Sequence, residues 1–159
     1  MRRLVDALYR VGLRAAWLGA RVWFLIGRPQ IRAVTVLVHW QGQVLLLTQS
    51  YRAGPSFPGG MLKRGEDPLA GALREIAEEI GLRPAADALR FLQILPQQKW
   101  GAKIDLHCFE LRLVEEPLLE LDHREVVAAA FLPLAEVVAA LPEFVTLLEK
   151  LAPIDAGSP

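Results

Sequence analysis

Three glutamates near the end of one predicted helix have the residue type and spacing of a chemical site. They are Glu75, Glu78 and Glu79, in the segment Arg-Glu-Ile-Ala-Glu-Glu. At 3.6 residues per turn they fall within an arc of about 100°, where like charges and the negative helix end repel. Carboxylate oxygens are hard ligands, so a Mg²⁺ or Mn²⁺ ion would turn this repulsion into coordination. The alternative is a solvated acidic helix face, which is how most charge runs are used.

The helix that must position these glutamates has recognisable ends. Asp67 is a candidate N-cap and Pro68 a good first helical residue, while Gly81 ends the helix where a left-handed residue is favoured. The apolar residues between them recur at helical spacing and form one stripe, namely Leu69, Leu73, Ile76 and Ile80. The pattern therefore predicts a helix that packs through this stripe and presents the glutamates on its other side.

The stretch from Gly60 to Leu82 helps to choose between a metal site and a solvated acidic helix face. It reads Gly, five residues, Glu, seven residues, then Arg-Glu-apolar-any-Glu-Glu-any-Gly-apolar. The fixed positions are filled by Gly60, Glu66, Arg74, Glu75, Ile76, Glu78, Glu79, Gly81 and Leu82. This pattern resembles the Nudix box, with every defining position present, and it favours the metal site.

The resemblance implies an α/β fold, the Nudix α/β/α sandwich with a mixed sheet, to which an N-terminal helix is added. It implies a pyrophosphohydrolase that uses Mg²⁺ or Mn²⁺ to cleave a phosphoanhydride bond in a nucleoside diphosphate linked to another moiety. Glu75, Glu78 and Glu79 are then metal ligands, and the Gly59 carbonyl is a further candidate. Supporting roles fall to Glu66, Gly60 and Arg74, and Arg74 is suited to hold a nearby glutamate by a bidentate pair.

Family members often use another carboxylate from outside the box, as a metal ligand or as the base. Glu125 precedes the last predicted strand and stands six residues before Phe131, about where the family places this group. We therefore prefer it to Glu120 and Asp122. The general base varies within the family, and Glu75 and Glu125 are the two candidates.

The residues that choose the substrate are less specific. Arg52 is a candidate phosphate contact, and Phe57, Trp100 and Tyr51 are candidates for stacking on a base, although each is equally suited to packing. Pro96 lies 14 residues after Leu82, close to a proline that accompanies ADP-ribose pyrophosphatases. The resemblance thus favours an ADP-ribose or nucleotide-sugar substrate, with nucleoside triphosphates next.

Two further hypotheses remain open. One is a non-catalytic nucleotide-binding sensor on a Nudix scaffold, although such proteins usually lose glutamates that this chain keeps. The other is a membrane-peripheral hydrolase that acts on a lipid-linked diphosphate, which is suggested by the first part of the chain.

Residues 1–28 are predicted to form an amphipathic helix over 2–27, which ends before Arg28-Pro29. Its arginines share one narrow face, and most of its other residues are apolar. Arg14 and Arg21 would be costly inside a bilayer, so we expect no membrane-spanning segment. Two interpretations remain: packing within the chain or on a second subunit of a homodimer, and binding to a membrane surface with the arginines on anionic headgroups.

Composition limits the remaining choices. The chain has 159 residues, of which 53% are hydrophobic, and 18 basic residues balance 18 acidic ones, so no nucleic-acid partner is expected. One cysteine, Cys108, fits a reducing compartment. We therefore expect a cytoplasmic protein, with membrane contact as the alternative, a Nudix domain over 29–152 and a flexible tail over 153–159.

The remaining elements of the domain are predicted from β-rich and helical runs. A hairpin joins strands 34–40 and 44–49 through Gln41-Gly42, and strands 89–95 and 102–113 are joined by residues 97–101. In the second of these strands the apolar phase changes at Cys108-Phe109, which predicts a β-bulge there. A solvated acidic loop over 115–122, a strand over 126–132 and two helices opened by Pro133 and Pro142 complete the chain.

Overall fold

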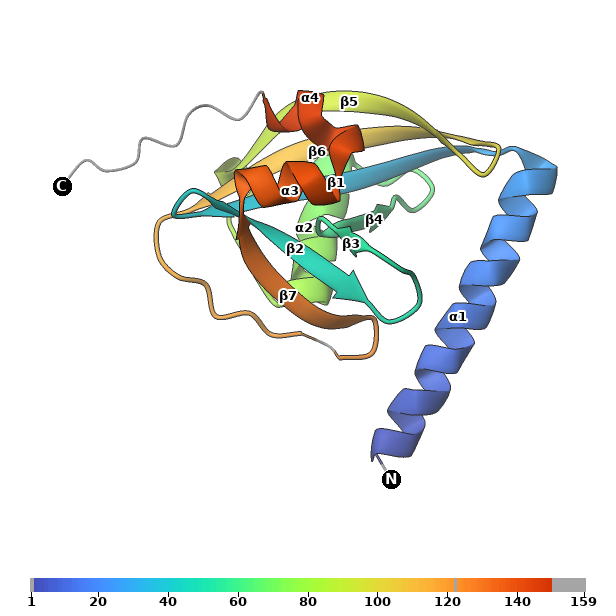
Figure 1. Cartoon of the computed structure of the whole chain (residues 1–159). Coiled ribbons are helices and arrows are strands. Elements are labelled where there is room, and N and C mark those ends of the chain that lie inside the picture. The colour runs from blue at the N-terminus through green and yellow to red at the C-terminus, as the bar shows by residue number, and fades with distance from the viewer. Residues whose placement is uncertain (1, 122, 150–159) are drawn as a thin grey trace.

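The computed structural model describes residues 2–121 and 123–149 (Figure 1). Within these residues, one long helix precedes seven strands and three further helices. In chain order these are α1 (Arg2–Gly27), β1 (Gln30–Trp40), β2 (Gln43–Gln49), β3 (Pro55–Ser56), β4 (Gly59–Met61), α2 (Pro68–Ile80), β5 (Leu89–Lys99), β6 (Ala102–Leu113), β7 (Val126–Pro133), α3 (Leu134–Ala140) and α4 (Val145–Leu148). Short 3₁₀ turns at Ala86–Ala88 and Pro142–Phe144 precede β5 and α4.

The strands form one mixed sheet. Its order is β3-β2-β1-β6-β5, and β4 pairs with β1 while β7 pairs with β2. The central pair, β1 and β6, is parallel over the whole length of β1, and every other pairing is antiparallel. β1 pairs with β2 only near Trp40 and with β4 only near Thr35, so β2 and β4 separate from each other along β1. Helix α2 packs against β1 and β4.

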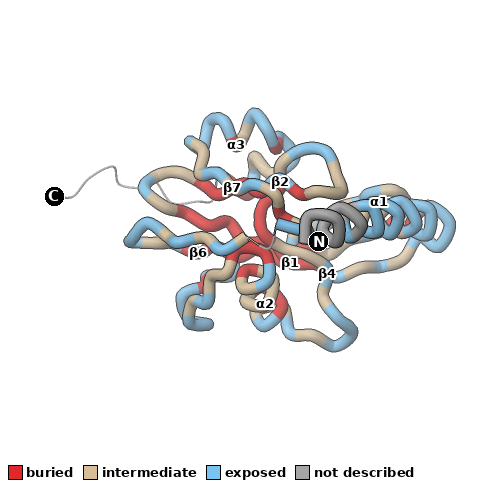
Figure 2. The backbone as a smooth tube through the Cα atoms, turned by 90° about the horizontal axis from the view of Figure 1, so that it is seen from below, coloured by how far each residue is buried: buried red, intermediate tan, exposed pale blue. Residues whose placement is uncertain are grey.

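Each face of the sheet is covered by helix. Ile76 and Ile80 of α2 pack on the side chains that β1, β2 and β6 turn to one face, and Val137 of α3 and Leu147 of α4 pack on the other. Figure 2 shows α2 and α3 on opposite sides of the strands. The predicted α/β/α sandwich with a mixed sheet is confirmed.

Both hairpins turn through two residues with left-handed backbones. Gln41 and Gly42 have φ of 46° and 79°, and Trp100 and Gly101 have 49° and 82°, which is the pattern of tight hairpin turns. The first turn was predicted correctly. The second was predicted to span residues 97–101, which was wrong because β5 stays paired with β6 as far as Lys99.

The bulge is also in a different strand from the one predicted. β6 pairs with β1 without interruption, and the register shift lies between Phe91 and Gln93 of β5, opposite Cys108 and Phe109. The apolar phase of β6 changes for another reason. In its first part, Leu106 and Cys108 face α3 and α4. In its second part, Phe109 and Leu111 face α2 on the opposite side of the sheet, so the apolar positions change from even to odd numbers. Cys108 is a buried core residue, as predicted.

The end of the domain departs from the prediction in two details. The predicted acidic loop holds Leu119 and Leu121 against the core beneath α2, so it is less solvated than expected. Pro142 opens a 3₁₀ turn, which α4 continues. The predicted tail over 153–159 and Asp122 lie outside the described residues.

Helix α1 spans the predicted range and packs only partly on the domain. Phe24 is buried, and the Nε of Arg14 donates to the backbone oxygen of Ser50 at 3.2 Å. The outer side of the helix exposes a stripe of apolar side chains, which are Val11, Leu18, Val22, Trp23, Leu25 and Ile26. One side of α1 thus packs within the chain, and contact of the other side with a second subunit or a membrane stays a prediction. Within the part of the chain that the structure describes, none of the helices has the length and apolarity needed to cross a bilayer.

Candidate active site

Local sequence fixes the helix that carries the glutamates. The Oδ1 of Asp67 accepts hydrogen bonds from the backbone nitrogens of Leu69 and Ala70 at 3.0 and 3.1 Å, which caps α2 at its start. Gly81 ends the helix with φ of 74°. With Ile76 and Ile80 buried beneath it, α2 holds its acidic residues at fixed positions along the sheet.

Glu79 is buried, with 4% of its surface exposed. Its Oε2 accepts from the Gly59 backbone nitrogen at 2.8 Å, and its Oε1 accepts from the Nε2 of Gln49 at 3.0 Å. Burial raises the pKa of Glu79 to about 8, against the opposing effect of these two hydrogen bonds. The sequence placed all three glutamates on the side of α2 that faces away from the core. This was wrong for Glu79, because Gln49 of β2 and Gly59 of β4 contact its carboxylate and bury it.

Gln49 was missed by the sequence analysis, although the sequence carries a signal for it. Leu45 and Leu47 of β2 face α2, and the period of two places Gln49 on the same face at the end of the strand. A polar side chain at such a buried position needs a polar partner, and Glu79 is that partner.

Arg74 gathers the other carboxylates. Its Nε and Nη2 bind the two oxygens of Glu66 at 2.8 and 3.0 Å, and its Nη1 binds Glu75 at 2.8 Å and Glu78 at 3.1 Å. The hydrogen bond from Arg74 lowers the pKa of Glu66 to about 2, whereas burial raises the pKa of Glu75. Glu66 thus fixes the guanidinium in place, as the bidentate pairing predicted from the sequence requires.

The two glycines before the helix bring backbone close to the carboxylates. A Cβ on Gly60 would lie 2.5 Å from the Oε1 of Glu75, and a Cβ on Gly59 would meet the backbone oxygen of Val34. Gly59 also has φ of 148°, a conformation that L side chains rarely adopt. Glycine at position 60 therefore leaves room for the Glu75 side chain, and glycine at position 59 lets β4 lie against β1.

Glu125 lies near the cluster although it is far away in the sequence. The hydroxyl of Tyr51 donates to its Oε1 at 2.9 Å, and its charge raises the pKa of both Glu75 and Glu79. The structure therefore brings together Glu75, Glu79 and Glu125, while Glu120 binds the end of α2 through its backbone nitrogen. The contact of Tyr51 with Glu125 was not foreseen, since Tyr51 was considered only for stacking.

The carboxylates fit a divalent cation by their donor chemistry. They are hard oxygen donors on one side of α2, and the Arg74 Nη1 already lies between the side chains of Glu75 and Glu78. In the part of the chain that the structure describes, no three acidic, histidine or cysteine side chains converge as a ready ligand set. The reason is visible in the contacts: Arg74 holds two of the glutamates, while Gly59 and Gln49 hold the third.

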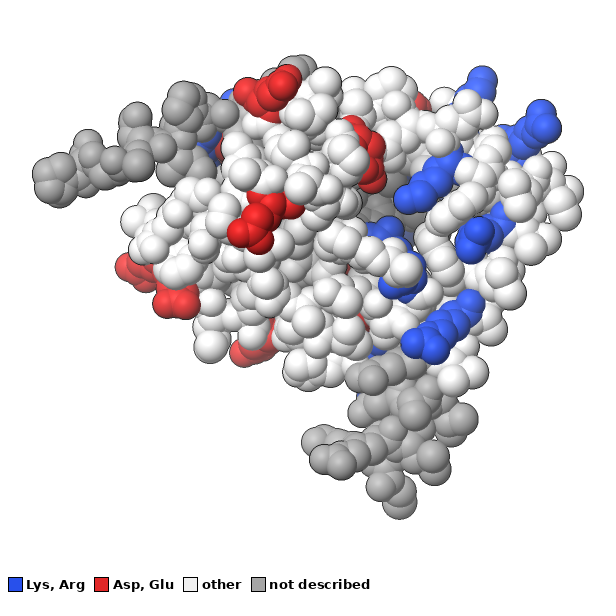
Figure 3. Space-filling model, in the orientation of Figure 1, with Lys and Arg blue, Asp and Glu red and all other residues white. Residues whose placement is uncertain are grey.

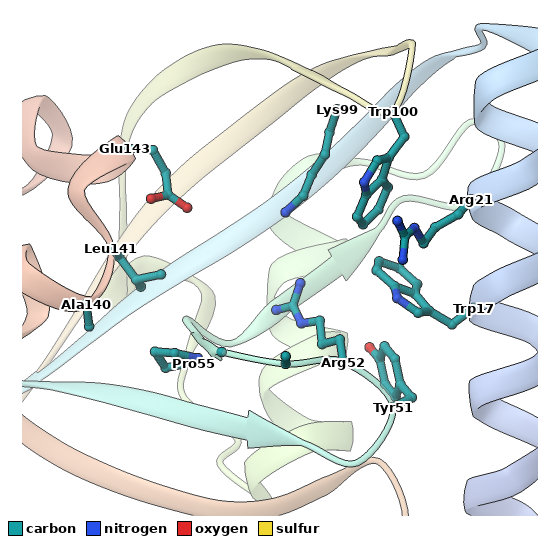
Figure 4. A pocket seen from close by; sticks show the side chains of 12 residues that line it. Trp17, Arg21, Tyr51, Arg52, Pro55, Lys99, Trp100, Ala140, Leu141 and Glu143 are labelled. Carbon is teal, nitrogen blue, oxygen red and sulfur yellow. The ribbon is translucent and has the colours of Figure 1, made fainter.

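A cavity of about 500 Å³ adjoins this cluster. Tyr51 belongs to both, because its ring lines the cavity and its hydroxyl binds Glu125. Two predicted substrate residues, Arg52 and Trp100, also line it (Figure 4), whereas Phe57 is buried in the core against Phe144. Figure 3 shows lysine and arginine side chains gathered around a hollow on the side of the molecule where α1 lies.

Comparison with known proteins places this geometry in a family. The model of the NUDIX domain family matches residues 29–153. An Ap4A hydrolase of C. elegans, in a binary complex, is 21% identical with a TM-score of 0.64, over 75% of this chain and 93% of that one. The NUDIX domain of Shewanella oneidensis NrtR, complexed with ADP ribose, is 20% identical with a TM-score of 0.63, over 76% and 84%. At such identities the likeness is one of fold, and the comparison with curated proteins gives no match.

Proposed function

The chain belongs to the NUDIX domain family, and we propose that it is a divalent-metal-dependent hydrolase of a phosphoanhydride bond in a nucleoside diphosphate linked to another moiety. The prediction of a Nudix pyrophosphohydrolase is confirmed at the level of the family. The metal dependence, the site residues and the substrate are parts of the proposal.

The observation that carries the proposal is the buried carboxylate of Glu79 beside Glu75 and Glu125. Burial and these two neighbours all oppose its negative charge, and the hydrogen bonds from Gly59 and Gln49 only partly offset them. Buried charges in proteins are usually paired or coordinate a metal. A bound cation is the partner that this arrangement lacks.

Glu75, Glu78 and Glu79 would hold Mg²⁺ or Mn²⁺, and the Gly59 carbonyl and Glu125 are further candidate ligands. When bound, the metal would neutralise the charge of the substrate diphosphate and make water easier to deprotonate. Arg74 would position Glu75 through its Nη1, while Glu66 holds the other side of the guanidinium.

The general base remains one of two residues. Burial raises the pKa of Glu75, which brings its proton affinity closer to what a base at neutral pH needs. Its Oε1 accepts from Arg74, so we assign proton transfer to its Oε2. Glu125 is the alternative, and the hydroxyl of Tyr51 would orient its carboxylate.

The test is phosphate release in Mg²⁺ or Mn²⁺ from ADP-ribose, nucleotide sugars, nucleoside triphosphates, dinucleoside polyphosphates and coenzyme A. Glu79→Gln removes one negative charge from the site, and Glu116→Gln removes one from an exposed loop as the control. We expect one substrate class to be hydrolysed, loss of that activity in Glu79→Gln, and wild-type activity in Glu116→Gln. Nucleotide binding without hydrolysis of any substrate would favour the sensor and refute the proposal.

A further inference from the structure

Helix α1 forms one wall of the cavity, although it lies outside the residues that the family model matches. Trp17 and Arg21 of α1 face Arg52 of the loop after β2, and they also face Lys99 at the end of β5 and Trp100 in the turn that follows (Figure 4). The end of α3 and the 3₁₀ turn after it close the far side, through Ala140, Leu141 and Glu143. The cavity therefore exists in this form only because α1 packs on the domain.

The cavity holds an excess of positive charge. Arg21, Arg52 and Lys99 approach it from three different elements, and Glu143 is the one acidic side chain among the described residues that line it. Burial and the neighbouring Arg52 lower the pKa of Lys99, and the charge of Glu143 acts in the opposite direction. The Nε of Arg52 is buried without a hydrogen-bond partner among the described residues. An anion would satisfy all three groups.

The Trp100 ring contacts two of the three cations, Arg21 and Lys99. The Arg21 guanidinium lies 4.9 Å from the centre of the Trp100 ring, and the Lys99 ammonium lies 5.1 Å from it. Trp17 packs edge-on against Trp100 at 4.9 Å and contacts Tyr51 at 5.5 Å. The rings therefore contact one another and the cations. The groups left to bind a ligand are the guanidinium and ammonium groups.

The charge of the cavity is opposite to that of the neighbouring carboxylate cluster, and Tyr51 connects the two. If metal holds a diphosphate at the glutamates, the substrate group attached to that diphosphate would lie in the cavity. In ADP-ribose or a nucleotide sugar this group is a neutral ribose or sugar, which would leave the excess of Arg21, Arg52 and Lys99 over Glu143 unbalanced. A further phosphate would balance this charge.

On the basis of the proposed hydrolase function, we propose that Arg21 of α1, with Arg52 and Lys99, binds a phosphate group beyond the two at the carboxylates. The substrate class is then a nucleoside triphosphate or a compound with a longer phosphate chain. This reverses the order that the sequence favours, and it gives a helix outside the family domain a direct part in choosing the substrate.

A binding experiment tests the cavity without turnover. Inorganic tripolyphosphate is titrated in EDTA, where the carboxylates repel it and only the cavity attracts it, and binding is followed by calorimetry. The proteins are full-length wild type and Arg21→Gln, with Arg21→Lys to retain the charge. Arg83→Gln at an exposed position and Val22→Gln on the outer side of α1 are controls. Circular dichroism verifies that each variant is folded.

We expect about tenfold weaker binding by Arg21→Gln, partial recovery in Arg21→Lys and wild-type affinity in both controls. Wild-type affinity in Arg21→Gln, or no binding by wild type, would overturn the inference. Displacement of tripolyphosphate by ATP supports the assignment to a nucleotide substrate. Displacement by farnesyl diphosphate as readily as by ATP, or displacement by neither, would overturn that assignment.

Turnover separates this inference from the proposed function. With Mg²⁺, Arg21→Gln should raise the KM for a nucleoside triphosphate about tenfold, leave kcat within twofold and leave the KM for ADP-ribose unchanged. If wild type hydrolyses nothing while Arg21 still governs tripolyphosphate binding, the proposed function fails and the anion site stands. If wild type is active and Arg21→Gln is unchanged in both assays, only the anion site fails.

Discussion

Replacing Glu79 with glutamine should stabilise the fold while it removes activity. Burial raises the pKa of Glu79 from 4.5 to about 8, so the folded protein holds a proton there over a pH range in which an unfolded glutamate has lost it. Because the folded state then binds more protons, the free energy of unfolding falls as pH rises from about 4.5 to 8 and levels off above that. A neutral side chain has no such dependence.

The size of the effect follows from the shift. At about 1.4 kcal/mol per pKa unit, the charged Glu79 costs roughly 3 to 5 kcal/mol of folding free energy at pH 8 and above. Glutamine avoids that cost if it keeps the hydrogen bonds. Its oxygen can accept from Gly59, and its amide can donate to Gln49 after the Gln49 amide rotates, because the Oε1 of Gln49 is buried without a partner among the described residues.

The assay is urea unfolding in EDTA at pH values from 5 to 9, for wild type, Glu79→Gln and the exposed control Glu116→Gln. Glu79→Gln should gain about 3 kcal/mol or more over wild type at pH 8 and much less at pH 5. His39 and His107, whose pKa values are lowered by burial, titrate in all three proteins and cancel in the comparison. Equal stability of wild type and Glu79→Gln at pH 8 would refute the reasoning.

Three further predictions follow from the contacts. Gly60→Ala places a Cβ 2.5 Å from the Glu75 Oε1 and should lower kcat about 100-fold in the phosphate-release assay with little change in the urea midpoint; normal activity would show that Glu75 can move freely. Glu66→Gln frees Arg74 to compete for Glu75 and should raise the Mg²⁺ concentration for half-maximal activity about 10-fold, and an unchanged metal titration would contradict this role. The apolar stripe of α1 predicts self-association or binding to anionic vesicles, and a monomer in sedimentation that also ignores vesicles would exclude both.

The sequence was a good guide wherever a local pattern determines the structure. The N-cap at Asp67, the left-handed Gly81 and the helical stripe predicted α2 with its correct ends, and the Gln41-Gly42 turn predicted the first hairpin. These features depend on residues a few positions apart, so propensity and periodicity suffice.

The errors arose where distant segments meet. Helical spacing gives the direction of Glu79 but not the presence of Gln49 and Gly59 beside it, so its burial could not be predicted. The contact between Tyr51 and Glu125 joins residues 74 positions apart. The phase change in β6 was assigned to a bulge because the sequence does not reveal which helices cover each half of a strand.

The site has an acidic region, at the carboxylates, and a basic region, at the cavity, and together they fit one kind of ligand. The carboxylates on α2 and Glu125 attract a metal ion but repel an anionic substrate, and the cations of the cavity attract an anion but repel a metal ion. A nucleotide that carries its divalent cation presents both charges together and satisfies both. Since Arg21 comes from α1, detaching that helix would remove part of the cavity while leaving α2 intact. The proposed division of labour is therefore that α2 provides the chemistry of hydrolysis and α1 the choice of phosphate chain.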